Sequence, residues 1–191
     1  MRKILILAGP SAVGKTTVAG ELIKRNPKFQ LIRSATTRAR RGDGFDGEYV
    51  YLTEEEFKAA ISNSEMLEYT EFGGNFYGTP LSEIESAFAR GKIPLLILDI
   101  NGVGSLKGKS RDFYSFSVYI TADLEELDRR LYERVLASPD KVGAVAIYEK
   151  RRAQNRTDLE NLKNIQNLFD FTVKNEEIEK TSDLILKSFF K

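Results

Sequence analysis

The feature that most constrains the fold of this chain is a short apolar run that leads into a glycine-rich loop near its start. Residues 3–8 read Lys-Ile-Leu-Ile-Leu-Ala, and the next eight, Gly9 to Thr16, follow the pattern G-x-x-x-x-G-K-[ST]. A run of six such residues suits a buried strand, and the apolar spacing in residues 17–25 predicts a helix. The chain therefore begins with a strand, a tight loop and a helix, which is typical of a parallel sheet.

The loop itself predicts a nucleoside triphosphate site. Its glycines let successive backbone N–H groups and the helix N-terminus point at one anionic centre. Lys15 would bridge the β and γ phosphates, Thr16 would hold Mg²⁺ through its hydroxyl, and Thr17 can reach the α phosphate. The alternative, a tight turn with a solvated lysine, is less favoured because the four fixed positions and the flanking elements agree. The residues expected to contact ATP here are Gly9, Ser11, Ala12, Val13, Gly14, Lys15, Thr16 and Thr17.

The rest of the chain alternates between strand and helix patterns. Further buried strands are predicted at residues 29–34, 93–99, 114–120 and, more weakly, 171–173, and helices at 81–90 and 124–136;. The predicted fold class is therefore α/β, a P-loop NTPase-type parallel sheet flanked by helices.

Two segments interrupt this alternation. Residues 34–80 contain short strand patterns at 49–52, 65–72 and 75–77 around a helix that begins at Thr53, where Glu56 completes a capping box;. We interpret them as a small mixed α+β insertion. Residues 134–148 hold two helical patterns separated by Ser-Pro-Asp-Lys at 138–141, and we interpret them as a helical lid.

Composition narrows the chemistry. Among 191 residues, 29 Lys and Arg against 28 Asp and Glu leave a formal charge of +1, and there is no Cys and no His. Disulfides, thiolate zinc sites and imidazole bases are excluded, so any catalysis uses carboxylates, hydroxyls, amines and guanidiniums. The N-terminal apolar run is shorter than the about 7 to 15 residues of a signal peptide core. We expect one domain in the cytoplasm, bound neither to membrane nor to nucleic acid.

A second basic cluster lies between positions 33 and 41. It contains four arginines and no acidic residue, and two tyrosines follow it in the same insertion. Arginine forks hold phosphate oxygens through two bonds, so the cluster could capture a second phosphate, the acceptor. From the residues alone, a solvated basic face or a contact with RNA or DNA is equally possible. The cluster comprises Arg33, Arg38, Arg40 and Arg41, with Tyr49 and Tyr77 after it.

Glu68 is a candidate for base recognition. It stands in the alternating strand pattern Met-Leu-Glu-Tyr-Thr at 66–70. Guanine presents two adjacent donors, N1–H and the exocyclic amine, and a buried carboxylate accepts both, whereas Thr79 could donate to O6. The alternative is an exposed strand residue with no such role.

Taken in order, these elements resemble the guanylate kinase family. The resemblance rests on Gly9 to Thr16, on Ser-Ala-Thr-Thr-Arg at 34–38, on Glu68, on Asn-Phe-Tyr-Gly-Thr at 75–79 and on Leu-Asp at 98–99. It covers nearly the whole chain. It implies a core of residues 1–33, 81–133 and 149–191, a GMP-binding insertion of 34–80 and a lid of 134–148. The implied reaction transfers the γ phosphate of ATP to GMP or dGMP with Mg²⁺.

The resemblance also implies a role for particular positions. Ser34, Glu68 and Thr79 would contact guanine, and Asp99 would lie near both Mg²⁺ and the acceptor. Asn175 matches an asparagine near the ATP base, and the implied catalytic residues are Lys15, Arg38, Arg134 and Arg151. The acceptor phosphate would be held by Arg38, Arg41, Tyr49 and Tyr77, with Arg40 as the alternative to Arg41, and Arg152 is the alternative to Arg151.

The sequence departs from the family pattern in the spacing after Arg38, which is one residue shorter, in the lid, which is longer, and in the turn after Asp99. Val-Leu-Ala at 135–137 replaces the usual Gly-Thr-Glu, and the turn at Asn101 differs. Two alternatives therefore stay open, a related P-loop kinase for another small phosphorylated acceptor and a non-catalytic protein-binding module. The module is disfavoured because Gly14, Lys15 and Thr16 are all present. A monomer or a homodimer is expected.

Overall fold

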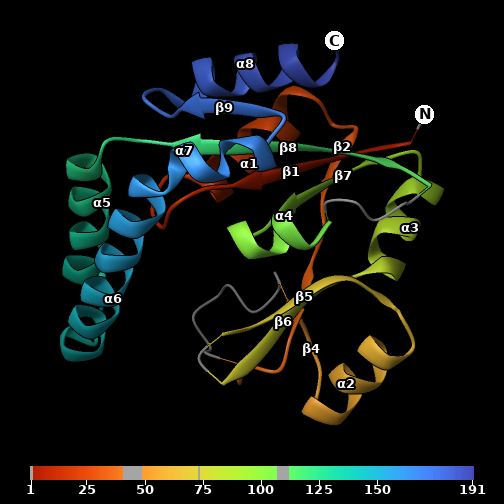
Figure 1. Ribbon diagram of the computed structural model, residues 1–191, viewed down its shortest axis with the longest axis horizontal. Helices are drawn as coiled ribbons and strands as arrows, with labels where there is room; N and C mark the ends of the chain where they lie inside the picture. Colours follow the sequence, from red (N-terminus) through yellow and green to blue (C-terminus); the bar gives the residue numbers. More distant parts are fainter. Residues whose placement is uncertain (1, 41–48, 73, 107–111) are drawn as a thin grey trace.

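The computed structural model of the chain describes residues 2–40, 49–72, 74–106 and 112–191. Figure 1 shows one large sheet with helices around it, and two smaller units that extend from it in the same direction. The strands are β1 Lys3–Ala8, β2 Phe29–Leu31, β3 Ser34–Thr36, β4 Tyr49–Tyr51, β5 Met66–Phe72, β6 Asn75–Pro80, β7 Ile93–Ile97, β8 Tyr114–Thr121 and β9 Phe171–Lys174. The helices are α1 Lys15–Arg25, α2 Glu54–Ser62, α3 Leu81–Ala89, α4 Ile100–Leu106, α5 Leu124–Ala137, α6 Lys141–Glu160, α7 Leu162–Ile165, the 3₁₀ turn η2 Gln166–Leu168 and α8 Ile178–Phe189.

The large sheet has the strand order β2-β7-β1-β8-β9, and all of its neighbouring strands are parallel. In the central strand, Leu5 is in register with Leu95 on one side and Phe116 on the other. Parallel strands need helical crossovers, which cover both faces of the sheet. The predicted fold class, a parallel sheet flanked by helices, is confirmed.

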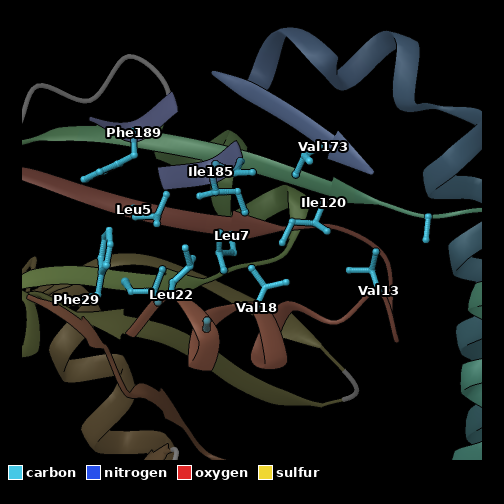
Figure 2. Packing of buried hydrophobic residues seen from close by; sticks show 14 of the residues in the cluster. Leu5, Leu7, Val13, Val18, Leu22, Phe29, Ile120, Val173, Ile185 and Phe189 are labelled. Carbon is cyan, nitrogen blue, oxygen red and sulfur yellow. The ribbon is translucent and has the colours of Figure 1, made fainter. Parts of the chain in front are cut away.

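Each face of the sheet carries its own apolar core. The side chains of β1 alternate, so Leu5 and Leu7 face α1 and α8, where they meet Leu22 and Phe189;. Figure 2 shows this cluster between the sheet and α1. The opposite face contains Ile4, Ile6 and Ala8 and is covered by α3 and α4. Burial on both faces explains why β1 reads as a continuous apolar run.

The insertion forms a second, four-stranded sheet of order β4-β3-β6-β5, with α2 beside it. The capping box predicted for α2 is present. Thr53 accepts a hydrogen bond from the Glu56 backbone, and the Glu56 carboxylate accepts one from the Thr53 backbone. Thr53 thereby satisfies donors at the helix start that have no partner inside the helix.

The prediction of a single strand at residues 29–34 is wrong. The chain instead forms β2 in the large sheet and β3 in the small one. The Ile32 N–H still donates to the Leu95 oxygen, but Arg33 turns outward to pair with Glu83 on α3. Apolar residues continue from β2 through Leu31 and Ile32 to the point where the chain changes sheet, so the sequence pattern does not reveal the change.

Residues 124–160 form a helical hairpin. Antiparallel contacts such as the Arg152–Asp128 ion pair at 2.8 Å and the Tyr132–Tyr148 ring pair hold α5 against α6. The predicted break at residues 138–141 separates the two helices.

The prediction of a strand at 93–99 is two residues too long, because β7 ends at Ile97. None of the helices in the described part of the chain has the length and apolar character needed to cross a bilayer.

Candidate active site

The loop between β1 and α1 has backbone angles that demand glycine at position 9. Gly9 has a φ angle of 146°, and Gly14 has one of 100°. A Cβ at position 9 would lie 2.1 Å from the main-chain oxygen of Ile120 on β8. The neighbouring strand therefore leaves no room for a side chain where the loop leaves β1.

Lys15 holds the loop from within. Its Nζ donates to the carbonyl oxygens of Gly9, at 2.7 Å, and Pro10, at 2.9 Å. Thr16 and Thr17 follow in the first turn of α1 and are exposed, so their hydroxyls can be reached by a ligand. The first turn of this helix also presents N–H groups that have no partner inside it.

The charges around Lys15 come from distant parts of the chain. Burial lowers the pKa of Lys15 to about 8, and the charge of Arg134 on α5 adds to this effect;. Arg151 on α6 also lowers the pKa, whereas Asp158 and Asp99 raise it. The structure thus brings Arg134 and Arg151, which were predicted from the sequence, into electrostatic range of the loop lysine.

Two cavities meet beside this lysine. The larger, about 670 Å³, is bounded by Gly9, Ser11 and Lys15 on one side and by residues of α6 and α7 on the other. The smaller, about 220 Å³, lies over the insertion. Residues 97–99 line both cavities, so Asp99 stands where they adjoin. The smaller cavity is lined by Ser34, Tyr49, Glu68, Thr70, Tyr77, Gly78 and residues 97–99, which include five of the predicted acceptor-site residues.

Glu68 is buried, with 5% of its surface exposed, and the Thr79 hydroxyl donates to its Oε1 at 2.7 Å. Gly102 lies against the other oxygen, because a Cβ at that position would be 3.1 Å from Glu68 Oε2 and 3.2 Å from Asp99 Oδ1. The Gly102 N–H also donates to Asp99 Oδ1 at 2.6 Å. The alternative of an exposed strand glutamate is thus wrong, and Glu68 and Asp99 flank one glycine.

The arginines of the insertion lie among tyrosine rings. The Arg38 guanidinium is 5.2 Å from the centre of the Tyr49 ring, and its Nη2 donates to the Tyr51 hydroxyl at 3.4 Å. Arg40 lies 4.3 Å from the Tyr51 ring, and Tyr77 contacts Tyr49 edge-on. Such contacts hold a guanidinium while leaving its donors available. Arg41, the predicted partner of Arg38, lies outside the described residues.

Asn175 holds the loop rather than facing a cavity. It is buried, its Nδ2 donates to the Val13 oxygen at 2.7 Å, and its Oδ1 accepts from the Thr181 hydroxyl at 3.1 Å. Arg130 on α5 donates to the same Val13 oxygen at 3.2 Å. A third cavity of about 480 Å³ lies beside this region, lined in part by Gly14, Thr17, Arg130 and Arg134. The predicted contact of Asn175 with the ATP base stays a prediction.

Sequence reasoning missed several residues that the fold brings to these cavities or to the side chains that line them. Tyr51 follows Tyr49 at the two-residue spacing of a strand, and Arg130 precedes Arg134 by one helical turn;. Those spacings could have indicated a shared face. Asp158, which accepts a hydrogen bond from Gln154 at 2.8 Å, and Gly102 give no such signal, because their neighbours are distant in sequence.

A divalent cation would find few protein ligands here. In the described part of the chain, no group of three or more acidic residues is arranged to hold a metal ion. Mg²⁺ bound to a nucleotide usually needs only one or two protein oxygens, since phosphates and water supply the others. Asp99 lines the larger cavity together with Lys15, and Thr16 follows Lys15 in the first turn of α1 and is exposed; one carboxylate and one hydroxyl fit that requirement.

A loop with the P-loop pattern, arginines on a helical hairpin and a second pocket lined by a buried carboxylate are together typical of a P-loop nucleoside monophosphate kinase;. The family model described as guanylate kinase matches residues 1–191. The chain belongs to the guanylate kinase family.

Individual relatives agree with this assignment. A guanylate kinase of Prochlorococcus marinus subsp. pastoris is 35% identical over 189 residues, which cover 98% of this chain and 96% of the relative. One of Thermobifida fusca is 35% identical, with 97% and 89% covered. The crystal structure of a guanylate kinase from Anaplasma phagocytophilum superposes with a TM-score of 0.68 at 29% identity, and the match covers 99% of this chain and 85% of that one.

Proposed function

We propose that this chain transfers the γ phosphoryl group of ATP to GMP, and to dGMP, forming ADP and GDP or dGDP. One observation carries the proposal. The cavity that contains the loop lysine and the cavity that contains the buried Glu68–Thr79 pair adjoin at Asp99. A donor and an acceptor bound in the two cavities would therefore meet phosphate to phosphate. Residues 34–80 act as the acceptor unit and residues 134–148 as the lid.

The donor site uses the loop and the start of α1. Backbone N–H groups from Gly9 to Thr16 surround the β phosphate, and Lys15 exchanges its bonds with two carbonyl oxygens for the β and γ phosphates;. Thr17 reaches the α phosphate. Thr16 and Asp99 would hold Mg²⁺, which neutralises charge on the β and γ oxygens when it is bound.

The acceptor site selects guanine through Glu68. A carboxylate offers only acceptors, and guanine presents two adjacent donors, whereas adenine presents a donor beside an acceptor. Thr79 fixes the carboxylate with one hydrogen bond, and Ser34 completes the base contacts. Arg38, together with Tyr49 and Tyr77, binds the acceptor phosphate, with Arg41 or Arg40 beside it.

Transfer then needs alignment and charge neutralisation more than proton chemistry. The acceptor is already an anion, so the absence of histidine from the chain is no obstacle;. Lys15, Arg134 and Arg151 stabilise the charge on the phosphoryl group as it passes between the two sites. Closing the hairpin over the larger cavity excludes water and so limits hydrolysis of ATP.

The direct test is ADP formation from MgATP with GMP, dGMP, AMP, CMP and UMP offered separately, against a reaction without acceptor. We expect turnover with GMP and dGMP alone. Turnover with another monophosphate and none with GMP would refute the assignment of Glu68. ATP binding without turnover on any acceptor would refute the proposed reaction.

A further inference from the structure

One polar contact near the phosphate-binding loop has no place in the reaction as described so far. Asn155 projects from α6 and is completely buried, with 0% of its surface exposed. The Ser11 N–H donates to its Oδ1 at 2.8 Å, and its Nδ2 donates to the Ser11 carbonyl oxygen at 3.0 Å. The two residues are 144 positions apart, and both bonds join the same pair. A reciprocal pair of this kind fixes both the distance and the orientation of the partners.

The contact joins two parts of the proposed active site. Ser11 lies in the middle of the loop, next to Ala12, whose φ angle is 64°. The loop is also held at Val13 by Asn175 and Arg130. Neither of those residues lies on α6, whereas the Asn155 amide links the loop to the helix that carries Arg151.

The position of Asn155 on α6 explains what this link would achieve. Arg151 comes four residues earlier and Asp158 three residues later, so all three lie along one face of the helix;. Arg151 and Asp158 are also two of the groups whose charges act on Lys15. Since the helix rises about 1.5 Å per residue, Arg151 stands roughly 6 Å along the axis from the residue that is fixed to the loop.

We propose that Asn155 is a positioning residue that fixes α6 to the loop backbone at Ser11, so that Arg151 is held at the distance at which it acts on the transferring phosphoryl group. This inference rests on the proposed function. It differs from a purely structural role, in which the buried amide only satisfies the polar groups of Ser11. A structural amide would affect stability, whereas a positioning amide also affects turnover, and only through Arg151.

A double-mutant cycle separates the two roles. We expect Asn155→Ala to lower kcat by about 10- to 100-fold at saturating ATP and GMP while the KM for GMP stays within about threefold, since small misplacements are costly in oriented reactions. In an Arg151→Ala background, Asn155→Ala should then change kcat by less than threefold. Equal effects of Asn155→Ala in the presence and absence of Arg151 would overturn the proposal.

The matched control is Arg156→Ala on the same helix. Arg156 is exposed and follows Asn155 directly, so its replacement perturbs α6 without touching the loop. We expect this variant to keep wild-type kcat. If circular dichroism shows that Asn155→Ala does not fold, Asn155→Ser replaces it. The serine side chain is shorter, so a water molecule can bridge its hydroxyl to Ser11. If the wild type is active and both Asn155 variants keep its kcat, the positioning role alone is refuted. If the wild type is inactive, the proposed function is refuted and this inference with it.

Discussion

The prediction with the sharpest structural basis is that Glu68→Gln abolishes the preference for guanine. Glu68 is buried, and its Oε1 already accepts from Thr79 at 2.7 Å. A glutamine has the same shape but one acceptor oxygen fewer, and its NH₂ would face a guanine N–H. The substitution thus removes one bond to the base and places two donors against each other.

The magnitude follows from these two effects. A hydrogen bond to a charged group contributes about 1.5–3 kcal/mol, and a buried donor left without an acceptor costs about 1–3 kcal/mol more. The sum of about 2.5–6 kcal/mol corresponds to a loss in kcat/KM for GMP of roughly 60- to 20,000-fold.

Inosine monophosphate makes the assay specific, because its base is guanine without the 2-amino group. ADP formation is measured with each nucleotide, for the wild type and for Glu68→Gln. We expect the wild type to prefer GMP over inosine monophosphate by about 10- to 150-fold, the equivalent of one bond to a charged acceptor. The variant should show little or no preference.

The ratio of activity on GMP to activity on inosine monophosphate is also independent of any loss of folded enzyme. A destabilised enzyme would lose activity on both nucleotides equally. A variant that keeps the wild-type ratio would therefore refute the assignment of Glu68, whatever its absolute rate. Glu71→Gln is the matched control, because Glu71 is exposed and lies on the same strand as Glu68. This variant should keep both the wild-type nucleotide preference and the wild-type rate of ADP formation.

Three further predictions concern the glycines and the loop lysine. Gly9→Ala should lower the free energy of unfolding by several kcal/mol, because the added Cβ would clash with the Ile120 main-chain oxygen;. Thermal unfolding measures this loss. Since the pKa of Lys15 is about 8 and the protonated amine binds phosphate, kcat/KM for ATP should fall as pH rises above about 8, measured between pH 6 and 10;. Gly102→Ala should raise the KM for GMP by about 3- to 10-fold, measured by steady-state kinetics, since its Cβ would displace the Glu68 carboxylate by a few tenths of an ångström and weaken a charged bond;.

Each of these has an outcome that would count against it. Gly20→Ala in α1 is the control for position 9, because no atom lies within 4 Å of the added Cβ, and it should stabilise the chain by about 0.5–1 kcal/mol;. A Gly9→Ala variant as stable as Gly20→Ala would contradict the first prediction. A flat profile up to pH 10 would contradict the second, and an unchanged KM for GMP the third.

The local features of this chain were predictable from the sequence. The loop from Gly9 to Thr16 and the capping box of α2 are recognisable from residue types at most eight positions apart, although distant residues such as Asn155 and Asn175 hold the folded loop. Backbone angles and helix ends are set at that range, so the residue types alone identify them. The same holds for β1, whose apolar run reflects burial on both faces.

Long-range features were not predictable in this way. The change of sheet after Ile32 depends on which strands lie beside it, and α4 is obscured by Gly102 and Gly104, which disfavour a helix;. The pairing of Asn155 with Ser11 spans 144 residues and follows from where α6 crosses the loop. A single sequence shows a buried asparagine as one more polar residue on a polar helix.

In the proposed reaction, the first turn of α4 would couple base recognition to phosphoryl transfer. Asp99 accepts the Gly102 N–H at 2.6 Å, as an N-cap residue does, so its carboxylate is fixed by the helix that it begins;. Gly102 in turn lies against Glu68 Oε2. Asp99, at the junction of the two cavities, and Glu68, which we propose selects the base, therefore lie against the same turn of the chain. We therefore expect a base that fits Glu68 poorly to present its phosphate poorly at Asp99 as well, so that selectivity for guanine would extend from binding to the rate of transfer.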